Sequence, residues 1–174
     1  RAVDYVAEGA ASIKVKLGTN THDDVARIRA IRDAIGMALP LQLDANQGWD
    51  AVTAITTLKA LEPFNITFCE EPVSHWNNLA LKRVHENSPI PIMADESVFD
   101  HHDAFRLAQM QACSYLNIKL AKSGGILAGL KISAVGEAAG LPCMVGGMFE
   151  TRVGISAAAH LFCARKNIIF ADLD

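Results

Sequence analysis

Hydrophobic and polar positions along the chain follow two periods that alternate. Short, mostly apolar runs typical of strands fall at residues 12–17, 41–43, 66–69, 92–94, 115–118, 142–145 and 168–171. Between them lie segments whose apolar residues recur every three or four positions, as on one face of a helix. The first two of these segments start with the candidate N-caps Thr21 and Asp50, and the others cover residues 76–86, 102–110, 125–139 and 153–164. Strict alternation of short strands and helices predicts an α/β fold with a parallel sheet that is buried on both faces.

A charged residue or a glycine pair stands at the carboxyl end of each predicted strand. The series is Lys16, Asp44, Glu70, Asp95, Lys119, Gly146-Gly147 and Asp172. The intervals are 28, 26, 25, 24, 27 and 26 residues, and such even spacing favours a closed TIM-type (β/α) barrel with its active site at these strand ends. An open doubly wound sheet usually binds ligands at one switch point beside a glycine-rich phosphate loop. The segment after the first predicted strand, residues 16–19, is not such a loop.

The number of strands bears on the domain organisation. A TIM-type barrel has eight strands, and the pattern supplies seven of them, preceded by residues 1–9, which look like the end of a helix. We therefore interpret residues 1–174 as one catalytic barrel domain that comprises strands two to eight. On this interpretation the first barrel strand is absent from the sequence.

Three carboxylates, Asp44, Glu70 and Asp95, end three successive predicted strands. In a barrel they are neighbours at the mouth, where three unpaired negative charges repel one another strongly. A hard divalent cation with oxygen ligands removes this repulsion, and Mg²⁺ is the natural choice. The alternative is that the carboxylates cap the following helices or pair with lysines. Their place in the motifs DANQGW, CEEPV and MADES favours the metal site.

Lysines flank these carboxylates on both sides. Lys14 and Lys16 are two positions apart on one strand and so point to the same face, and Lys119 ends the strand after that of Asp95. A second cation beside Lys16 favours its neutral form, which makes it a usable base. A substrate carboxylate on the metal would have one lysine on each face. That arrangement suits removal of the α-proton through an enediolate and its return on the other face, as in a racemase or epimerase.

Taken together, the motifs resemble those of the enolase superfamily, in particular its muconate-lactonizing-enzyme subgroup. The resemblance extends along the whole chain and rests on Lys14-Val15-Lys16, Asp44-Ala45-Asn46, Glu70-Glu71-Pro72, Asp95-Glu96-Ser97 and Asn117-Ile118-Lys119-Leu120 with Gly124-Gly125. One departure is Glu71, where many relatives have glutamine. We assign Glu70 as the metal ligand because it keeps the motif position.

The resemblance assigns a role to each of these residues. It implies that Mg²⁺ is bound by Asp44, Glu70 and Asp95. It implies that Lys16 and Lys119 are the two acid/base catalysts, with Lys14 in support of Lys16. Asn46 and Glu96 would be auxiliary groups around the metal. It also implies an N-terminal capping domain that precedes the barrel and is absent from this sequence.

The end of the chain narrows the substrate. Asp172 and Asp174 close the last predicted strand and point the same way. This Asp-x-Asp resembles that of the dipeptide epimerases, in which the pair holds the α-ammonium of a dipeptide, and two carboxylates are suited to such a cation. The alternative is an ordinary polar loop. Glu150, in a stretch that also resembles that family, either faces the substrate or pairs with Arg152.

We therefore expect a Mg²⁺-dependent epimerase that acts on dipeptides. A second hypothesis is another reaction of the same subgroup, o-succinylbenzoate synthesis or cycloisomerisation, in which the terminal aspartate pair would have no purpose. A third is a Schiff-base lyase that uses a strand-end lysine. A non-catalytic scaffold is a fourth, but none of the expected catalytic groups is missing.

Composition restricts the partners. The chain is 51% hydrophobic with a net charge of −3, which excludes a disordered protein and disfavours a sequence-independent nucleic-acid binder. No apolar run is long enough for a membrane span, and no signal peptide is visible.

The cysteines, Cys69, Cys113, Cys143 and Cys163, form no C-x-x-C pair, and we expect buried, reduced thiols in a cytoplasmic protein. We interpret His101-His102 as part of a solvated loop. The sequence does not decide whether the protein forms a homo-oligomer or which dipeptide side chains it prefers.

Overall fold

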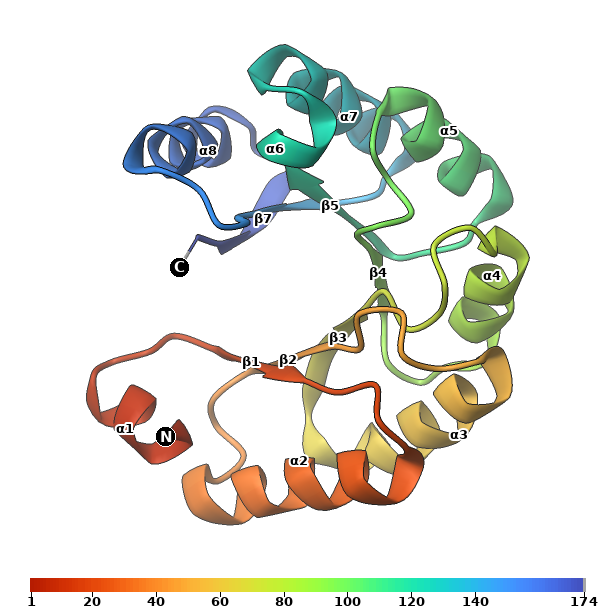
Figure 1. The fold of residues 1–174 in the computed structure, drawn as a ribbon, viewed down its shortest axis with the longest axis vertical. Helices are drawn as coiled ribbons and strands as arrows, with labels where there is room; N and C mark the ends of the chain where they lie inside the picture. Colours follow the sequence, from red (N-terminus) through yellow and green to blue (C-terminus); the bar gives the residue numbers. More distant parts are fainter. Residues whose placement is uncertain (174) are drawn as a thin grey trace. The chain divides into compact units, whose positions relative to one another are not determined.

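The computed structural model describes residues 1–173 and confirms the TIM-type α/β fold class, with seven strands alternating with helices in this part of the chain (Figure 1). Two compact units make up the chain, the first from Arg1 to Ile92 and the second from Met93 onward. Every strand pairing within each unit is parallel. The assignment of the seven strands to positions two to eight of a barrel stays a prediction.

The first unit contains three strands and the helices around them, drawn from red to yellow-green in Figure 1. Its elements are α1 (Ala2–Ala7), β1 (Ile13–Lys16), α2 (Thr21–Ile35), β2 (Leu41–Asp44), α3 (Ala51–Leu61), the 3-10 helix η1 (Glu62–Phe64), β3 (Ile66–Glu70) and α4 (Asn78–Asn87). In register, Lys16 of β1 pairs with Asp44 of β2, and Asp44 pairs with Glu70 of β3. The charged strand ends predicted from the sequence therefore lie side by side in this unit.

Polar side chains cap the starts of α2, α3 and α4 in the first unit. The side chain of Asn20 accepts a hydrogen bond from Asp23 N, so Asn20 caps α2, and not Thr21 as expected. Asp50 caps α3 as predicted. Its carboxylate accepts a hydrogen bond from the backbone amide of Thr53, and this bond lowers the pKa of the Asp50 carboxyl. Asn77 caps α4, which therefore starts two residues later than the expected Trp76.

The second unit contains the remaining strands. Its elements are β4 (Ile92–Ala94), whose first residue belongs to the first unit, α5 (His101–Met110), β5 (Tyr115–Lys119), α6 (Leu120–Ser123), α7 (Ile126–Ala139), β6 (Cys143–Gly146), α8 (Arg152–Ala164) and β7 (Ile168–Asp172). Ala94 pairs with Leu116 between β4 and β5. Lys119 pairs with Gly146, and Gly146 pairs with Asp172, so these predicted strand ends are also neighbours.

Two local predictions for the second unit are wrong. The short helix α6 was not expected. It follows Lys119 directly and ends at Gly124, where Gly124 and Gly125 take positive φ angles of 88° and 113° that L-residues rarely adopt. His101 and His102 form the first turn of α5 and not a loop, because Asp100 accepts hydrogen bonds from the amides of His102 and Asp103.

The cores of both units are built from the predicted apolar positions. Fully buried side chains include Ile28, Leu43 and Phe68 in the first unit and Leu107 and Ile118 in the second. The cysteines are free thiols; Cys69, Cys113 and Cys143 are buried as expected, whereas Cys163 is exposed. Over residues 1–173, no helix has both the length and the apolar character of a membrane span.

Candidate active site

In the first unit, a lysine of β1 bridges two buried carboxylates. Lys14 Nζ lies 2.7 Å from Glu70 Oε2 and 3.3 Å from Asp44 Oδ2. The side chains of Asp44 and Glu70 are 1% and 0% exposed. Because adjacent parallel strands bring the two acids together, their negative charges need a shared cation, and in this structure the Lys14 ammonium provides it.

The ammonium group of Lys16 is held by Asp44 at the end of β2 and by Asn46 in the turn that follows. Its Nζ lies 2.5 Å from Asp44 Oδ2 and donates to Asn46 Oδ1 at 2.9 Å. Asn46 adopts a left-handed conformation, with φ of 42°, which is stabilised because Asp44 Oδ1 accepts a hydrogen bond from Asn46 N at 2.9 Å. The sequence therefore placed Lys14, Lys16, Asp44, Asn46 and Glu70 together correctly.

In the second unit, Asp95 is bound by two lysines. Lys119 Nζ lies 2.5 Å from Asp95 Oδ2, and Lys122 Nζ lies 2.6 Å from Asp95 Oδ1. Lys122 also donates to the backbone carbonyl oxygens of Asp95 and of Asn117, the latter at 3.2 Å. Lys119 and Asp95 are thus brought together as predicted. Lys122, whose side chain is only 6% exposed, was missed.

A signal for Lys122 was present in the sequence. It follows Lys119 by three positions, so a helical turn after the strand places both ammonium groups on the same side. Because no helix was expected at residues 120–123, the spacing of the two lysines did not point to a shared site.

Two further acidic residues lie next to the proposed ligands. Glu71 is buried and turns the chain with φ of 35°, and Glu96 is half-buried directly after Asp95.

The expected substrate-binding residues lie on two further elements of the second unit. Glu150 Oε1 accepts a hydrogen bond from Met148 N at 3.2 Å, so this carboxylate supports its own β6–α8 loop. Asp172 ends β7 and its backbone oxygen accepts from Gly147 N at 2.8 Å. Asp174 lies outside the described residues. Contacts of Glu150 with a substrate or with Arg152 stay predictions.

The donor chemistry of the first unit fits a hard divalent cation. Asp44 and Glu70 offer carboxylate oxygens, the ligand type that Mg²⁺ prefers, in a buried place that already holds a positive charge. Within residues 1–173, however, no group of three or more histidine, cysteine or acidic side chains gathers closely enough to hold a metal ion. The three-ligand site expected with Asp95 therefore remains a prediction.

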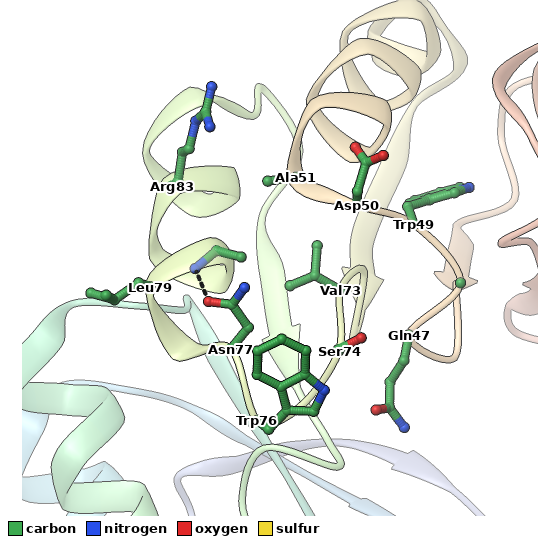
Figure 2. Close-up of a pocket in the computed structure, with 12 residues that line it drawn as sticks. Gln47, Trp49, Asp50, Ala51, Val73, Ser74, Trp76, Asn77, Leu79 and Arg83 are labelled. Atoms are coloured by element: carbon green, nitrogen blue, oxygen red, sulfur yellow. Dashed lines mark hydrogen bonds between the residues drawn. The ribbon is translucent and has the colours of Figure 1, made fainter.

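A hollow in the first unit is a separate feature. It encloses about 680 Å³ between the start of α3 and α4, and Figure 2 shows Val73 and Trp76 on its walls with Asp50 at the start of α3. Trp76 is 74% exposed. None of Lys14, Lys16, Asp44 or Glu70 lines this hollow, so it is separate from the cluster that these four residues form.

The chain was also compared with known proteins. The family model described as "Enolase C-terminal domain-like" matches residues 1–173. A D-Ala-D/L-Ala epimerase from Cytophaga hutchinsonii is 49% identical over 173 residues, which cover 99% of this chain and 47% of that protein. The chain thus spans about half the length of the curated relatives it matches.

Two solved structures are also similar to this chain over almost its whole length. The crystal structure of a dipeptide epimerase from Enterococcus faecalis V583 superposes with a TM-score of 0.98 at 45% identity, covering 99% of this chain and 50% of that one. A dipeptide epimerase from Cytophaga hutchinsonii, complexed with Mg and the dipeptide D-Ala-L-Val, has a TM-score of 0.97 at 48% identity, covering 99% of this chain and 47% of that one.

Proposed function

The chain belongs to the enolase C-terminal domain-like family, and we propose that the protein is a Mg²⁺-dependent epimerase that acts on dipeptides. The observation that carries the proposal is the likeness, over nearly the whole chain, to epimerases whose structures include a complex with Mg and a dipeptide. The Lys16–Asp44–Asn46 contacts support it, because they gather on neighbouring strand ends the residue types that this chemistry uses.

Asp44, Glu70 and Asp95 would hold the metal ion. When bound, the ion supplies positive charge that stabilises the negative charge developing on the substrate carboxylate as the α-proton leaves. Lys14 bridges two of these carboxylates in the structure, and in the proposal it keeps that neighbourhood neutral. Asn46 and Glu96 act as auxiliary groups.

Lys16 and Lys119 would exchange the α-proton, one removing it as a base and the other returning it as an acid. The Lys16 side chain is 64% exposed, so its ammonium can reach a bound molecule. In the proposal, Asn46 holds the tip of Lys16 by the hydrogen bond to its Oδ1. Two lysines with opposite tasks explain why the product is the epimer and not the starting isomer.

Asp172 and Asp174 would bind the α-ammonium of the dipeptide. This contact separates the proposal from cycloisomerisation and o-succinylbenzoate synthesis, whose substrates carry no such cation. The proposed location is the cytoplasm, in keeping with the free thiols.

The test is Asp172→Asn in the full-length protein, assayed with free and N-acetylated dipeptides. Loss of one charged partner of the α-ammonium should raise KM for free dipeptides about 10- to 100-fold and leave the acetylated substrates unaffected. Asp33→Asn, at an exposed aspartate of α2, is the matched control. Unchanged kinetics of Asp172→Asn with free dipeptides would contradict the assignment.

A further inference from the structure

Lys16 cannot be positioned by packing around its side chain. The side chain is 64% exposed, and a long, exposed lysine has several accessible rotamers. Proton transfer requires the donor and acceptor to lie within hydrogen-bonding reach. Asp44 and Asn46 hold the ammonium at its tip, so its position depends on these contacts and on how firmly the backbone is held where β1 ends.

A buried carboxylate of α2 organises that backbone. Asp24 is 0% exposed, and its Oδ2 accepts hydrogen bonds from Gly18 N at 3.2 Å, Thr19 N at 3.0 Å and Trp49 Nε1 at 3.1 Å. Two of these donors belong to the loop after β1, and the indole belongs to the loop after β2. One carboxylate thus joins the loops that follow Lys16 and Asn46.

Arg27 extends this network to Lys16 itself. Its Nη1 donates to the backbone oxygen of Lys16 at 2.7 Å and lies 3.5 Å from Asp24 Oδ1. The next amide, Leu17 N, donates to Asp44 O at 2.9 Å. The peptide after Lys16 is therefore held on its carbonyl side by Arg27 and on its amide side by β2.

The two loops also meet directly, backbone against backbone. A Cβ at Gly48 would lie 2.4 Å from Gly18 O, and a Cβ at Gly18 would lie 2.3 Å from Ala45 O. Such close approach transmits a displacement of one loop to the other, because no flexible side chain lies between them.

We propose that Asp24, Arg27 and Trp49, here called the Asp24 network, are positioning residues that hold the end of β1 so that Lys16 meets Asn46 and the substrate α-carbon. The proposal rests on the epimerase function proposed above. None of the three needs to touch the substrate. A displacement of about 1 Å at a reacting group can cost about 100-fold in rate, so loosening this network should lower turnover without removing any reacting group.

The test uses Arg27→Gln in the full-length protein, with Arg29→Gln as the matched control on an exposed arginine of the same helix. Each epimer of a dipeptide that the wild type converts is incubated in deuterated water with Mg²⁺. Arg27→Gln should lower epimerisation about 10- to 100-fold, together with α-proton exchange of the epimer that Lys16 deprotonates. Exchange of the epimer that Lys119 deprotonates should stay within about threefold of wild type, because Lys119 and not Lys16 takes the proton in this step. A general loss of structure would lower both exchanges alike.

Trp49→Phe removes the indole N–H donor to Asp24 together with part of the buried ring, and it should give the same one-sided loss. It keeps the proposal testable if Arg27→Gln fails to fold. Wild-type epimerisation in Arg27→Gln and Trp49→Phe, or equal loss of both exchange reactions, would overturn the proposal.

A second measurement separates this proposal from the proposed function. Amide hydrogen exchange at residues 17–19, without substrate, should be faster in Arg27→Gln than in Arg29→Gln, and equal rates would overturn the network. If the wild type neither epimerises nor exchanges any dipeptide, the proposed function fails, and amide exchange still decides whether Arg27 holds the end of β1.

Discussion

At the scale of single residues, the two carboxylate oxygens of Asp44 contact different partners, and so do those of Asp95. Asp44 uses Oδ1 to hold the Asn46 turn and Oδ2 to face Lys14 and Lys16. Asp95 gives Oδ1 to Lys122 and Oδ2 to Lys119. In each case one oxygen fixes the orientation of the carboxylate, and the other faces a proposed catalytic lysine.

Lys122 offers a direct test of this orientation. Lys122→Met removes the donor to Asp95 Oδ1 and to two backbone carbonyls, so each of these acceptors loses one hydrogen-bond partner. We expect a loss of about 1–3 kcal/mol in the free energy of unfolding, measured by urea denaturation of the full-length protein. Lys131→Met, on the exposed face of α7, should stay within about 0.5 kcal/mol of wild type. Equal midpoints for the two variants would refute the structural role of Lys122.

The pairings at the strand ends could be predicted from sequence, because residues that end neighbouring parallel strands meet at one edge. Lys16 with Asp44 and Lys119 with Asp95 follow from that rule and from the family motifs. The contacts of Asp24 could not, since they depend on a helix residue that reaches two loops at once. Nothing in the local pattern of residues 21–35 distinguishes Asp24 from an ordinary acid in a first turn.

At the scale of elements, the loops after β1 and β2 are joined through glycines. Gly18 has φ of 99° and no room for a Cβ, whereas Gly36, which ends α2, has φ of 74° with nothing within 4 Å of the added atom. The two positions share a positive φ and differ in crowding. This pair of residues can therefore separate conformational cost from steric cost.

We expect Gly36→Ala to destabilise the protein by about 1–3 kcal/mol, because φ of 74° with ψ of −167° lies in a region that essentially only glycine adopts. Gly18→Ala should cost about 1–3 kcal/mol more, because the methyl group meets the Ala45 carbonyl oxygen. It should also lower epimerisation, since it displaces the loop next to Lys16. Thermal unfolding of both variants measures the difference, and equal losses would show that the loop contact is not tight.

The boundaries of the helices and strands show which elements the spacing of apolar residues can predict. Strands and long helices were placed within a few residues, because their apolar positions face a core. The four-residue helix α6 was missed, since one turn is too short to show a period. Asn20, and not Thr21, caps α2, and α4 starts two residues after the expected position because Asn77 caps it, as happens where several polar residues compete for one cap.

At the scale of the whole molecule, burial decides which thiols are accessible. Burial raises the pKa of Cys143 to about 12 and that of Cys69 well above its usual value. At pH 8 both stay protonated in the native state, and only Cys163 is exposed. Titration with a thiol reagent should therefore label Cys163 rapidly and the other cysteines only after denaturant is added. Fast labelling of Cys69 or Cys143 in the native protein would contradict the described core.

The fold class and the family could be read from sequence over the whole chain, since evenly spaced strand ends and ordered motifs carry information at that scale. Which dipeptide the proposed epimerase prefers could not, because the chain spans about half the length of its relatives. Oligomeric state has no signature in this pattern.

The most direct test of the proposed function is a deuterium-exchange screen. The full-length protein is incubated with a dipeptide library in deuterated water with Mg²⁺, and each dipeptide is analysed by mass spectrometry and NMR. We predict label at the α-carbon of the C-terminal residue in a subset of free dipeptides, with inversion at that carbon, and loss of both on substitution of Lys16 together with Lys119. Absence of label from every dipeptide would contradict the proposed epimerase function.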